Sequence, residues 1–261
     1  TSNGVSINTE MPGETEDMEI GETSGIAEIT LPSGEIYQNE NVVNILLLGT
    51  DERSSAFSDN ARADSIMLLS VDRQYHAVRL VSFERAIGVP VPGRNDDWLT
   101  HTFRYGGANL TLQTVRESFC IDVEHYIRTN FYTFEQIVDT IGKEALAYCR
   151  LRSIDSDWIR IRRQRDTIQA ILTQIKTLSL FDLNKLLDKI LPLVKTNLTM
   201  GEMAGFLVDA TSIIGTQAEQ LTIPAQGTYW GITGIDGRSM YACDYEENRR
   251  ILRSFLYAPY L

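Results

Sequence analysis

The sequence predicts an α/β fold in which a mixed central sheet is flanked by helices, as a three-layer sandwich. Short apolar runs of strand length alternate along the chain with longer segments of helical periodicity, and this alternation is typical of a sheet covered by helices. The chain has 261 residues, of which 43% are hydrophobic, so it can bury a substantial core as one large domain or two small ones.

The strands are expected to begin after a polar N-terminal segment. Residues 1–41 are rich in Gly, Glu, Ser and Thr, and we interpret them as a tail or linker that precedes one domain at residues 42–261. The domain opens with the apolar run NVVNILLLG, which is typical of a strand in a sheet covered on both faces. Two more strands are expected at Ser65–Asp72 and Ala77–Phe83, as a hairpin or as adjacent strands.

The rest of the domain alternates between helices and strands. Apolar residues at helical spacing predict a helix over 108–119, and a strand is expected over 125–131. A helix over 133–142 would have Thr133 as its N-cap and Gly142 as its C-cap. Further helices are expected over 143–152, 159–180, 183–195, 200–214 and 245–257, of which the one over 183–195 is interrupted or ended near Pro192. Strands that close the sheet are expected near Leu221 and over 239–244.

Composition argues against several classes of function. A formal net charge of −11 argues against a general nucleic-acid binder, which would show a basic face. The apolar runs are far shorter than the roughly 18 residues that a membrane span requires. No CxxC spacing or histidine partner suggests a zinc site, and the odd cysteine count allows at most one disulfide. We interpret the isolated histidines as structural or exposed and the cysteines as packing residues: His76, His101, His125, Cys120, Cys149 and Cys243.

Polar side chains of opposite charge follow the first and third predicted strands. Asp51 and Arg53 come directly after the first strand, and Arg62 and Asp64 open the next apolar run. We therefore expect a loop that presents two carboxylates and two guanidinium groups. Arg85 stands just after the third strand, and loops at strand ends are where α/β folds place chemistry.

A cluster of six arginines lies between Arg150 and Arg165 in this acidic chain. Guanidinium groups bind two oxygens at once, so the cluster favours a polyanionic ligand. Together with the carboxylates it predicts a diphosphate site, because Mg²⁺ is typically held by one or two carboxylates plus phosphate oxygens. The alternatives are that the aspartates only shape turns and caps, and that the arginines form a solvated helix face. We interpret Arg163 and Arg165 as surface residues.

Seven segments, in order across residues 41–170, resemble the LytR-CpsA-Psr (LCP) family of bacterial cell-envelope phosphotransferases. They read NILLLGTDER, ARADSIMLLS, LVSFER, THTFRYGGANLTLQTV, YIRTNFYTFEQIVDTIG, EALAYCRLR and DSDWIRIRRQR. The resemblance implies an LCP-type fold, Mg²⁺ as cofactor, and transfer of a glycopolymer from a polyprenyl-pyrophosphate carrier to peptidoglycan. It places this activity on the extracellular face of the bacterial cytoplasmic membrane, with a membrane anchor ahead of Thr1.

The resemblance also assigns roles to residues. Asp51 and Asp64 match the family's magnesium-binding aspartates, and Arg53, Arg62 and Arg85 match catalytic arginines that line the diphosphate. The remaining pyrophosphate-binding group would consist of Arg150, Arg152, Arg160 and Gln164.

The chain departs from the family pattern at two places. Glu84-Arg85-Ala86 stands where the family usually has Pro-Arg-Asp, so an aspartate for proton transfer is absent or is replaced by Glu84. The usual excursion between Gly142 and Lys143 is also absent. Two alternative functions follow: a protein that captures a polyprenyl phosphate without turnover, and a hydrolase that uses water as the acceptor.

Overall fold

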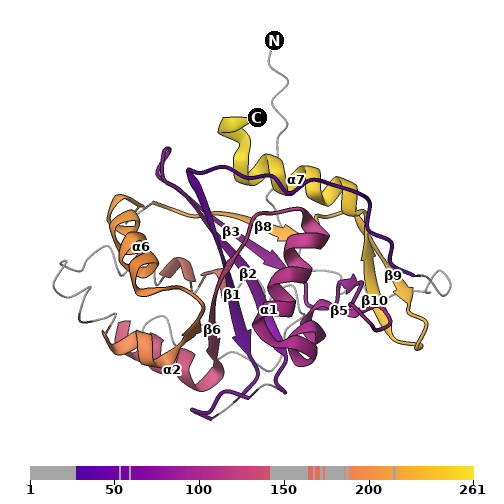
Figure 1. Cartoon of the computed structure of the whole chain (residues 1–261), viewed down its shortest axis with the longest axis horizontal. Helices are drawn as coiled ribbons and strands as arrows, with labels where there is room; N and C mark the ends of the chain where they lie inside the picture. The colour runs from indigo at the N-terminus through magenta and orange to yellow at the C-terminus, as the bar shows by residue number, and fades with distance from the viewer. Residues whose placement is uncertain are drawn as a thin grey trace.

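Figure 1 shows a computed structural model of the chain, in which a central sheet lies among helices. The structure describes residues 28–52, 54–58, 60–141, 164–166, 168–170, 173, 185, 188–213 and 216–261. The division of the chain at residue 41 stays a prediction. Within the described part of the predicted tail, Ile29 is buried and Tyr37 packs edge-on against Tyr257, with their ring centroids 4.7 Å apart.

The central sheet has six strands in the order β7-β6-β1-β2-β3-β8. β1 pairs in parallel with β6 and antiparallel with β2, and β3 pairs antiparallel with β2 and in parallel with β8. The sheet is therefore mixed, as the sequence predicted. The strands are Val42–Thr50 (β1), Ala63–Asp72 (β2), Ala77–Phe83 (β3), His125–Asn130 (β6), Lys195–Thr196 (β7) and Glu219–Ile223 (β8).

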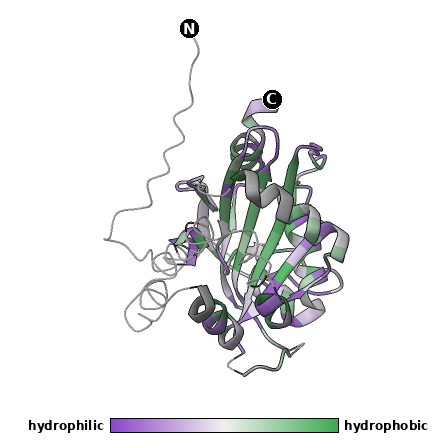
Figure 2. Cartoon of the chain, turned by 90° about the vertical axis from the view of Figure 1, so that its left-hand side faces the viewer, coloured by the Kyte–Doolittle hydropathy of each residue, from purple (hydrophilic) through white to green (hydrophobic). Residues whose placement is uncertain are grey.

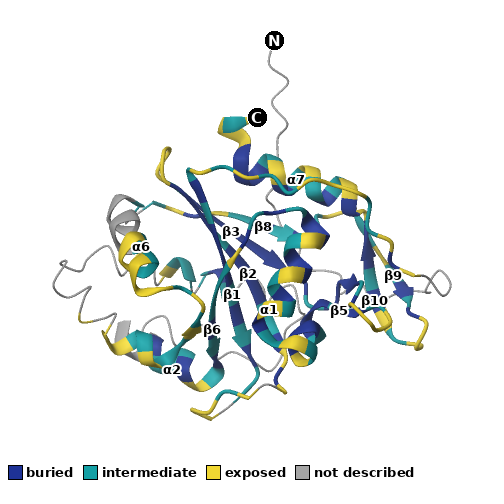
Figure 3. Cartoon of the chain, viewed as in Figure 1, coloured by how far each residue is buried: buried dark blue, intermediate teal, exposed yellow. Residues whose placement is uncertain are grey.

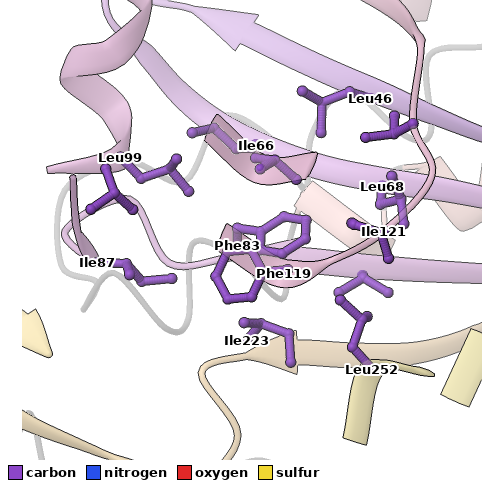
Figure 4. Close-up of a cluster of buried hydrophobic side chains, with 14 of the residues drawn as sticks. Leu46, Ile66, Leu68, Phe83, Ile87, Leu99, Phe119, Ile121, Ile223 and Leu252 are labelled. Atoms are coloured by element: carbon purple, nitrogen blue, oxygen red, sulfur yellow. The ribbon is translucent and has the colours of Figure 1, made fainter. Parts of the chain in front are cut away.

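Helices cover both faces of the sheet. α1 (Leu99–Phe119) and α7 (Tyr245–Tyr257) pack on the face that carries the main core, where the rings of Phe83 and Phe119 lie 5.0 Å apart (Figure 4). A smaller apolar cluster on the other face joins Val78 and Leu80 to Ile168 and to the last residue of α6 (Met200–Ile213). Apolar strands between these layers are visible in Figure 2, and the arrangement confirms the predicted three-layer fold.

One strand prediction is wrong. Residues 239–244 were expected to close the central sheet, but β10 (Ser239–Cys243) pairs only with β9 (Tyr229–Thr233) among the named strands that the structure describes. The reason is a tight turn in which Gly237, at φ +80°, donates its N–H to the Gly234 carbonyl and returns the chain onto β9. β4 (Gly88–Val89) and β5 (Asp97–Trp98) form another two-stranded ribbon.

Two helix starts also differ from the predictions. α1 begins at Leu99 rather than at residue 108, and a kink at Gly106 and Gly107, the latter at φ +65°, joins its two segments. α2 (Phe131–Ile141) is capped by Asn130, whose side-chain Oδ1 accepts the Thr133 N–H at 2.9 Å, so Thr133 is not the N-cap. Thr133 Oγ1 in turn accepts the Asn130 N–H at 3.0 Å, a reciprocal arrangement that satisfies two backbone donors.

The remaining helices largely follow the sequence pattern. α7 has the predicted bounds, and α6 ends one residue before the predicted end. The predicted end near Pro192 is confirmed by a 3₁₀ turn at Leu191–Leu193 (η1); a second 3₁₀ turn, Ala258–Tyr260 (η2), follows α7. The predicted C-cap Gly142 and the helix over 143–152 lie outside the described residues. None of the described helices combines the length and the hydropathy needed to cross a bilayer.

Candidate active site at one edge of the sheet

One edge of the sheet gathers the ends of several strands. β1, β3, β6 and β8 run in the same direction, and β2 runs against them, so β2 begins where its neighbours end. Asp51 follows β1, Asp64 is the second residue of β2, and Arg85 follows β3 by two residues. The loop from β1 to β2, residues 51–62, lies at this edge; most of its described residues are exposed, whereas the strands are largely buried (Figure 3). The fold thus brings four of the predicted site residues to one place.

Asp51 and Arg62 hold each other across the two ends of this loop. The Asp51 carboxylate accepts the Arg62 backbone N–H at 3.0 Å and the Arg62 Nε–H at 3.4 Å, and Asp51 N–H donates to the Arg62 carbonyl at 3.2 Å. The Arg62 side chain is 47% exposed and that of Asp51 33%. An ion pair this exposed contributes at most about 1 kcal/mol to stability, so an incoming anion can compete for the guanidinium group at little cost.

A β-bulge aims Asp64 toward Arg85. Gly49 pairs with Ser65 but Thr50 pairs with Ala63, so Asp64 is the extra residue and its side chain leaves the regular alternation of the strand. Its Oδ1 lies 3.6 Å from Arg85 Nη1. That oxygen is buried, and the described residues offer it no hydrogen bond. A Cβ added to Gly49 would lie 2.9 Å from the Ser65 Cβ, so the bulge depends on glycine at this position.

The first turn of α1 fixes the backbone around Arg85. Thr100 donates its N–H to the Arg85 carbonyl at 3.0 Å and its hydroxyl to the Ala63 carbonyl at 2.8 Å, which ties β2 and β3 to the helix. Asp97, just before the helix, binds the side chains of His101, Tyr105 and Arg238. Burial opposes ionisation of Asp97, but these hydrogen bonds outweigh it and lower the pKa of the carboxyl group.

Glu84 has its carboxylate turned into the protein. Glu84 is only 1% exposed, and its Oε1 accepts the Ala86 N–H at 3.2 Å. Burial, and secondarily the charge of Glu84, raise the pKa of the Tyr229 hydroxyl. Glu84 therefore shapes the backbone at Ala86, the position where the family pattern has an aspartate.

The remaining predicted site residues are only partly described. Arg53, Arg150, Arg152 and Arg160 lie outside the described residues, and Gln164 is a half-buried helical residue. The expectation that Arg165 lies on the surface is wrong. Arg165 is 3% exposed because its Nη1 donates to the Leu221 carbonyl at 2.9 Å and to Thr222 Oγ1 at 2.7 Å, groups of β8. Arg163 lies outside the described residues.

Two charged residues of this edge were missed by sequence reasoning. Arg128, near the end of β6, is 4% exposed and donates a 2.5 Å hydrogen bond to Glu52, the residue after Asp51. The one available signal was an arginine inside the strand pattern HYIRTNF, where an inward-facing charge requires a partner.

The residues at this edge fit a magnesium ion that takes two protein carboxylates. Asp51 and Asp64 supply carboxylate oxygens from neighbouring strands, and the buried Oδ1 of Asp64 lacks a hydrogen-bond donor within the described part of the chain. No group of three or more His, Cys, Asp or Glu residues gathers there or elsewhere in the described ranges. Mg²⁺ often takes only one or two protein carboxylates and completes its shell with water and phosphate oxygens, so the pair is a sufficient donor set.

Comparison with known proteins finds similarity both in sequence and in fold. The model of the LytR_cpsA_psr family matches residues 6–142 and 141–254. The chain is 30% identical over 216 residues to the polyisoprenyl-teichoic acid–peptidoglycan teichoic acid transferase TagT of Bacillus subtilis, covering 69% of this chain and 67% of the relative. It is also 30% identical over 236 residues to the enzyme of the same description, TagU, of Oceanobacillus iheyensis, covering 77% and 72%.

Solved structures share the fold. The crystal structure of B. subtilis TagV superposes with a TM-score of 0.68 at 20% identity, covering 84% of this chain and 98% of that one. A structure described as TagT bound to LIIa-WTA gives a TM-score of 0.66 at 24% identity, covering 88% and 98%.

Proposed function

The chain belongs to the LytR_cpsA_psr family, and we propose from this premise that it transfers a glycopolymer from a polyprenyl-pyrophosphate carrier to peptidoglycan. The relatives TagT and TagU are named as transferases that move teichoic acid from a polyisoprenyl carrier to peptidoglycan, which supports this class of reaction. The site of action is the outer face of the cytoplasmic membrane, where a lipid-linked donor and a peptidoglycan acceptor meet.

One observation carries the proposal most directly. Two carboxylates and two guanidinium groups lie at the ends of β1, β2 and β3, at one edge of the sheet, as the pairs Asp51–Arg62 and Asp64–Arg85. Each of these side chains keeps a quarter or more of its surface exposed, so the groups are accessible to a ligand. Such a mixture of charges suits a diphosphate that arrives with a divalent cation.

The side chains of the site would act by positioning and by neutralising charge. The acceptor hydroxyl oxygen forms a bond to the sugar-proximal phosphorus while the bond from that phosphorus to the bridging oxygen breaks. Polyprenyl phosphate leaves, and the hydroxyl proton passes to the departing phosphate or to water. Arg62 and Arg85 bind the phosphate oxygens and offset the negative charge that grows on the leaving group. Arg53, Arg150, Arg152, Arg160 and Gln164 are proposed to complete this set.

Asp51 and Asp64 would hold the Mg²⁺ ion. When bound, the ion supplies Lewis-acid polarisation of the phosphoryl oxygens and charge stabilisation of the leaving phosphate. In this arrangement the two aspartates would serve the cation, and Arg62 and Arg85 would bind oxygens of the diphosphate.

A transfer assay tests the proposed function. The purified protein is incubated with Mg²⁺, a short polyprenyl-diphosphate-linked glycan that carries a radiolabel in the sugar, and peptidoglycan fragments. We expect label in the peptidoglycan and a stoichiometric release of polyprenyl phosphate. Label released into solution at the same rate without peptidoglycan would identify a hydrolase instead. Tight binding of the lipid without either product would identify a capture protein.

A further inference from the structure

A buried ion pair joins the loop at residues 51–62 to strand β6. Arg128 Nη2 donates to Glu52 Oε1 at 2.5 Å and to the Ser58 carbonyl at 2.8 Å, and Arg128 Nε donates to Thr50 Oγ1 at 3.3 Å. The side chain of Arg128 is 5% exposed and that of Glu52 10%. The Arg128 guanidinium group thus binds Thr50 at the end of β1, Glu52 at the start of the loop and Ser58 in the middle of the loop.

Glu52 and Asn130 add further ties to the same loop. Glu52 Oε1 also accepts the Ser58 N–H at 2.8 Å, so this one oxygen links Glu52 both to Ser58 within the loop and to Arg128 on β6. The Glu52 carbonyl accepts the Phe131 N–H at 3.1 Å, and Asn130 Nδ2 donates to the Ser54 carbonyl at 3.0 Å. The end of β6 and the start of α2 therefore hold the first half of the loop at several backbone points.

Aromatic rings and cations alternate in a stack that links the loop to the core. The Arg128 guanidinium carbon lies 4.5 Å from the ring centroid of Phe103 and 4.9 Å from that of Phe57, so the cation is held between two rings. Lys195 Nζ approaches the Phe57 ring at 5.1 Å. Phe103 belongs to α1 and is fully buried, so the stack ties the loop to the rigid interior.

The energetics of a buried ion pair indicate a role beyond stability. Removing the charges of Glu52 and Arg128 from water costs free energy, and the attraction between them largely offsets that cost. The pair therefore stabilises the folded protein no more than apolar residues of similar size would. What the pair does supply is one fixed geometry for the loop. Glu52 follows Asp51 directly, and Asp51 fixes Arg62 at the far end of the loop. A change at Glu52 therefore reaches both the carboxylate and the guanidinium group of the site.

We propose that Glu52, Phe57 and Arg128 form a clamp that positions the 51–62 loop, so that Asp51 and Arg62 are held ready for a diphosphate ligand. This inference rests on the proposed function, because that function supplies the diphosphate. The three are positioning residues: they act on the ligand through Asp51 and Arg62.

The test compares two conservative changes of buried arginines. Arg128→Lys keeps the positive charge but loses the planar guanidinium group, which donates hydrogen bonds to both Glu52 and Ser58. Arg79→Lys is the matched control, because Arg79 is 6% exposed and pairs with Glu219 and Asp72 near the opposite end of the same sheet. Phe57→Leu is a milder second clamp variant that preserves both charges. Each protein is measured for thermal unfolding, for hydrogen exchange of the 51–62 peptide, and for calorimetric binding of farnesyl diphosphate with Mg²⁺.

The expected pattern separates positioning from general stability. Both clamp variants should exchange the 51–62 amides faster, and Arg128→Lys should bind farnesyl diphosphate about tenfold more weakly, equivalent to about 1.4 kcal/mol. Arg79→Lys should lose stability but keep the wild-type affinity and loop exchange. Wild-type exchange and affinity in the clamp variants, or an equal loss of affinity in Arg79→Lys, would overturn the clamp. Failure of the wild-type protein to bind the diphosphate would overturn the proposed function, while loop exchange would still decide whether the clamp exists.

Discussion

Replacing Gly49 by alanine should disturb the bulge that aims Asp64. The new Cβ would lie 2.9 Å from the Ser65 Cβ, whereas ordinary contacts between carbon atoms are about 3.5–4.0 Å, so the paired strands must separate locally by more than half an ångström. Overpacking of this kind typically costs about 1–3 kcal/mol. We expect the free energy of unfolding, from urea titration, to fall by that amount and the transfer rate to fall with it, because Asp64 and Arg85 would move apart.

The cause of the clash can be removed separately. The atoms nearest to the added Cβ are the Ser65 side-chain atoms at 2.9 and 3.7 Å, so the double variant Gly49→Ala, Ser65→Gly relieves the contact. Ser65→Gly alone should cost about 0.5–1 kcal/mol through the flexibility of glycine. The double variant should therefore be more stable than Gly49→Ala and recover much of the activity. Additive losses in the double variant would refute the steric explanation.

Two further predictions follow from buried titratable groups. Burial raises the pKa of Tyr257 to about 12, so its contribution to stability is complete below the ordinary tyrosine value of about 10 and is lost between the two. The wild-type free energy of unfolding should fall in this pH range by about 3 kcal/mol more than that of Tyr257→Phe. Equal slopes would contradict this assignment. Burial also raises the pKa of the Cys243 thiol to about 12, so near pH 8.5 very little of it is present as the reactive thiolate. Iodoacetamide should modify Cys243 at least about a hundredfold faster in the urea-unfolded protein, as measured by peptide mass mapping; similar rates would show that the thiol is accessible and ionised.

Much of the fold follows from local pattern. The apolar runs placed β1, β2 and β3 nearly as observed, because strands buried on both faces require continuous hydrophobic residues. α7 was also placed with its observed bounds, and the structure adds its N-cap, Asp244, whose side chain accepts the Glu247 N–H. The family resemblance, which the family match confirms, supplied the order of the site motifs.

Features set by tertiary contacts were not predictable in this way. The bulge at Asp64 depends on a single-residue shift of register between two strands, and apolar pattern does not report such a shift. Arg165 is buried because carbonyl and hydroxyl groups of β8 lie opposite it, although nothing near it in the sequence indicates that partner. The pairing of Glu52 with Arg128 likewise joins residues that are distant in sequence and adjacent only at the sheet edge.

The central claim is that the edge carrying Asp51, Arg62, Asp64 and Arg85 is the place of transfer. Arg85→Ala tests it most directly, because Arg85 is 28% exposed and its ion pair with Asp64, at 3.6 Å, contributes little to stability. Arg250→Ala is the control, since Arg250 pairs with Glu247 on the exposed face of α7. In the peptidoglycan transfer assay we expect Arg85→Ala to lose transfer at a thermal stability close to that of the wild type, and Arg250→Ala to retain it. Wild-type transfer by Arg85→Ala would contradict the location of the active site.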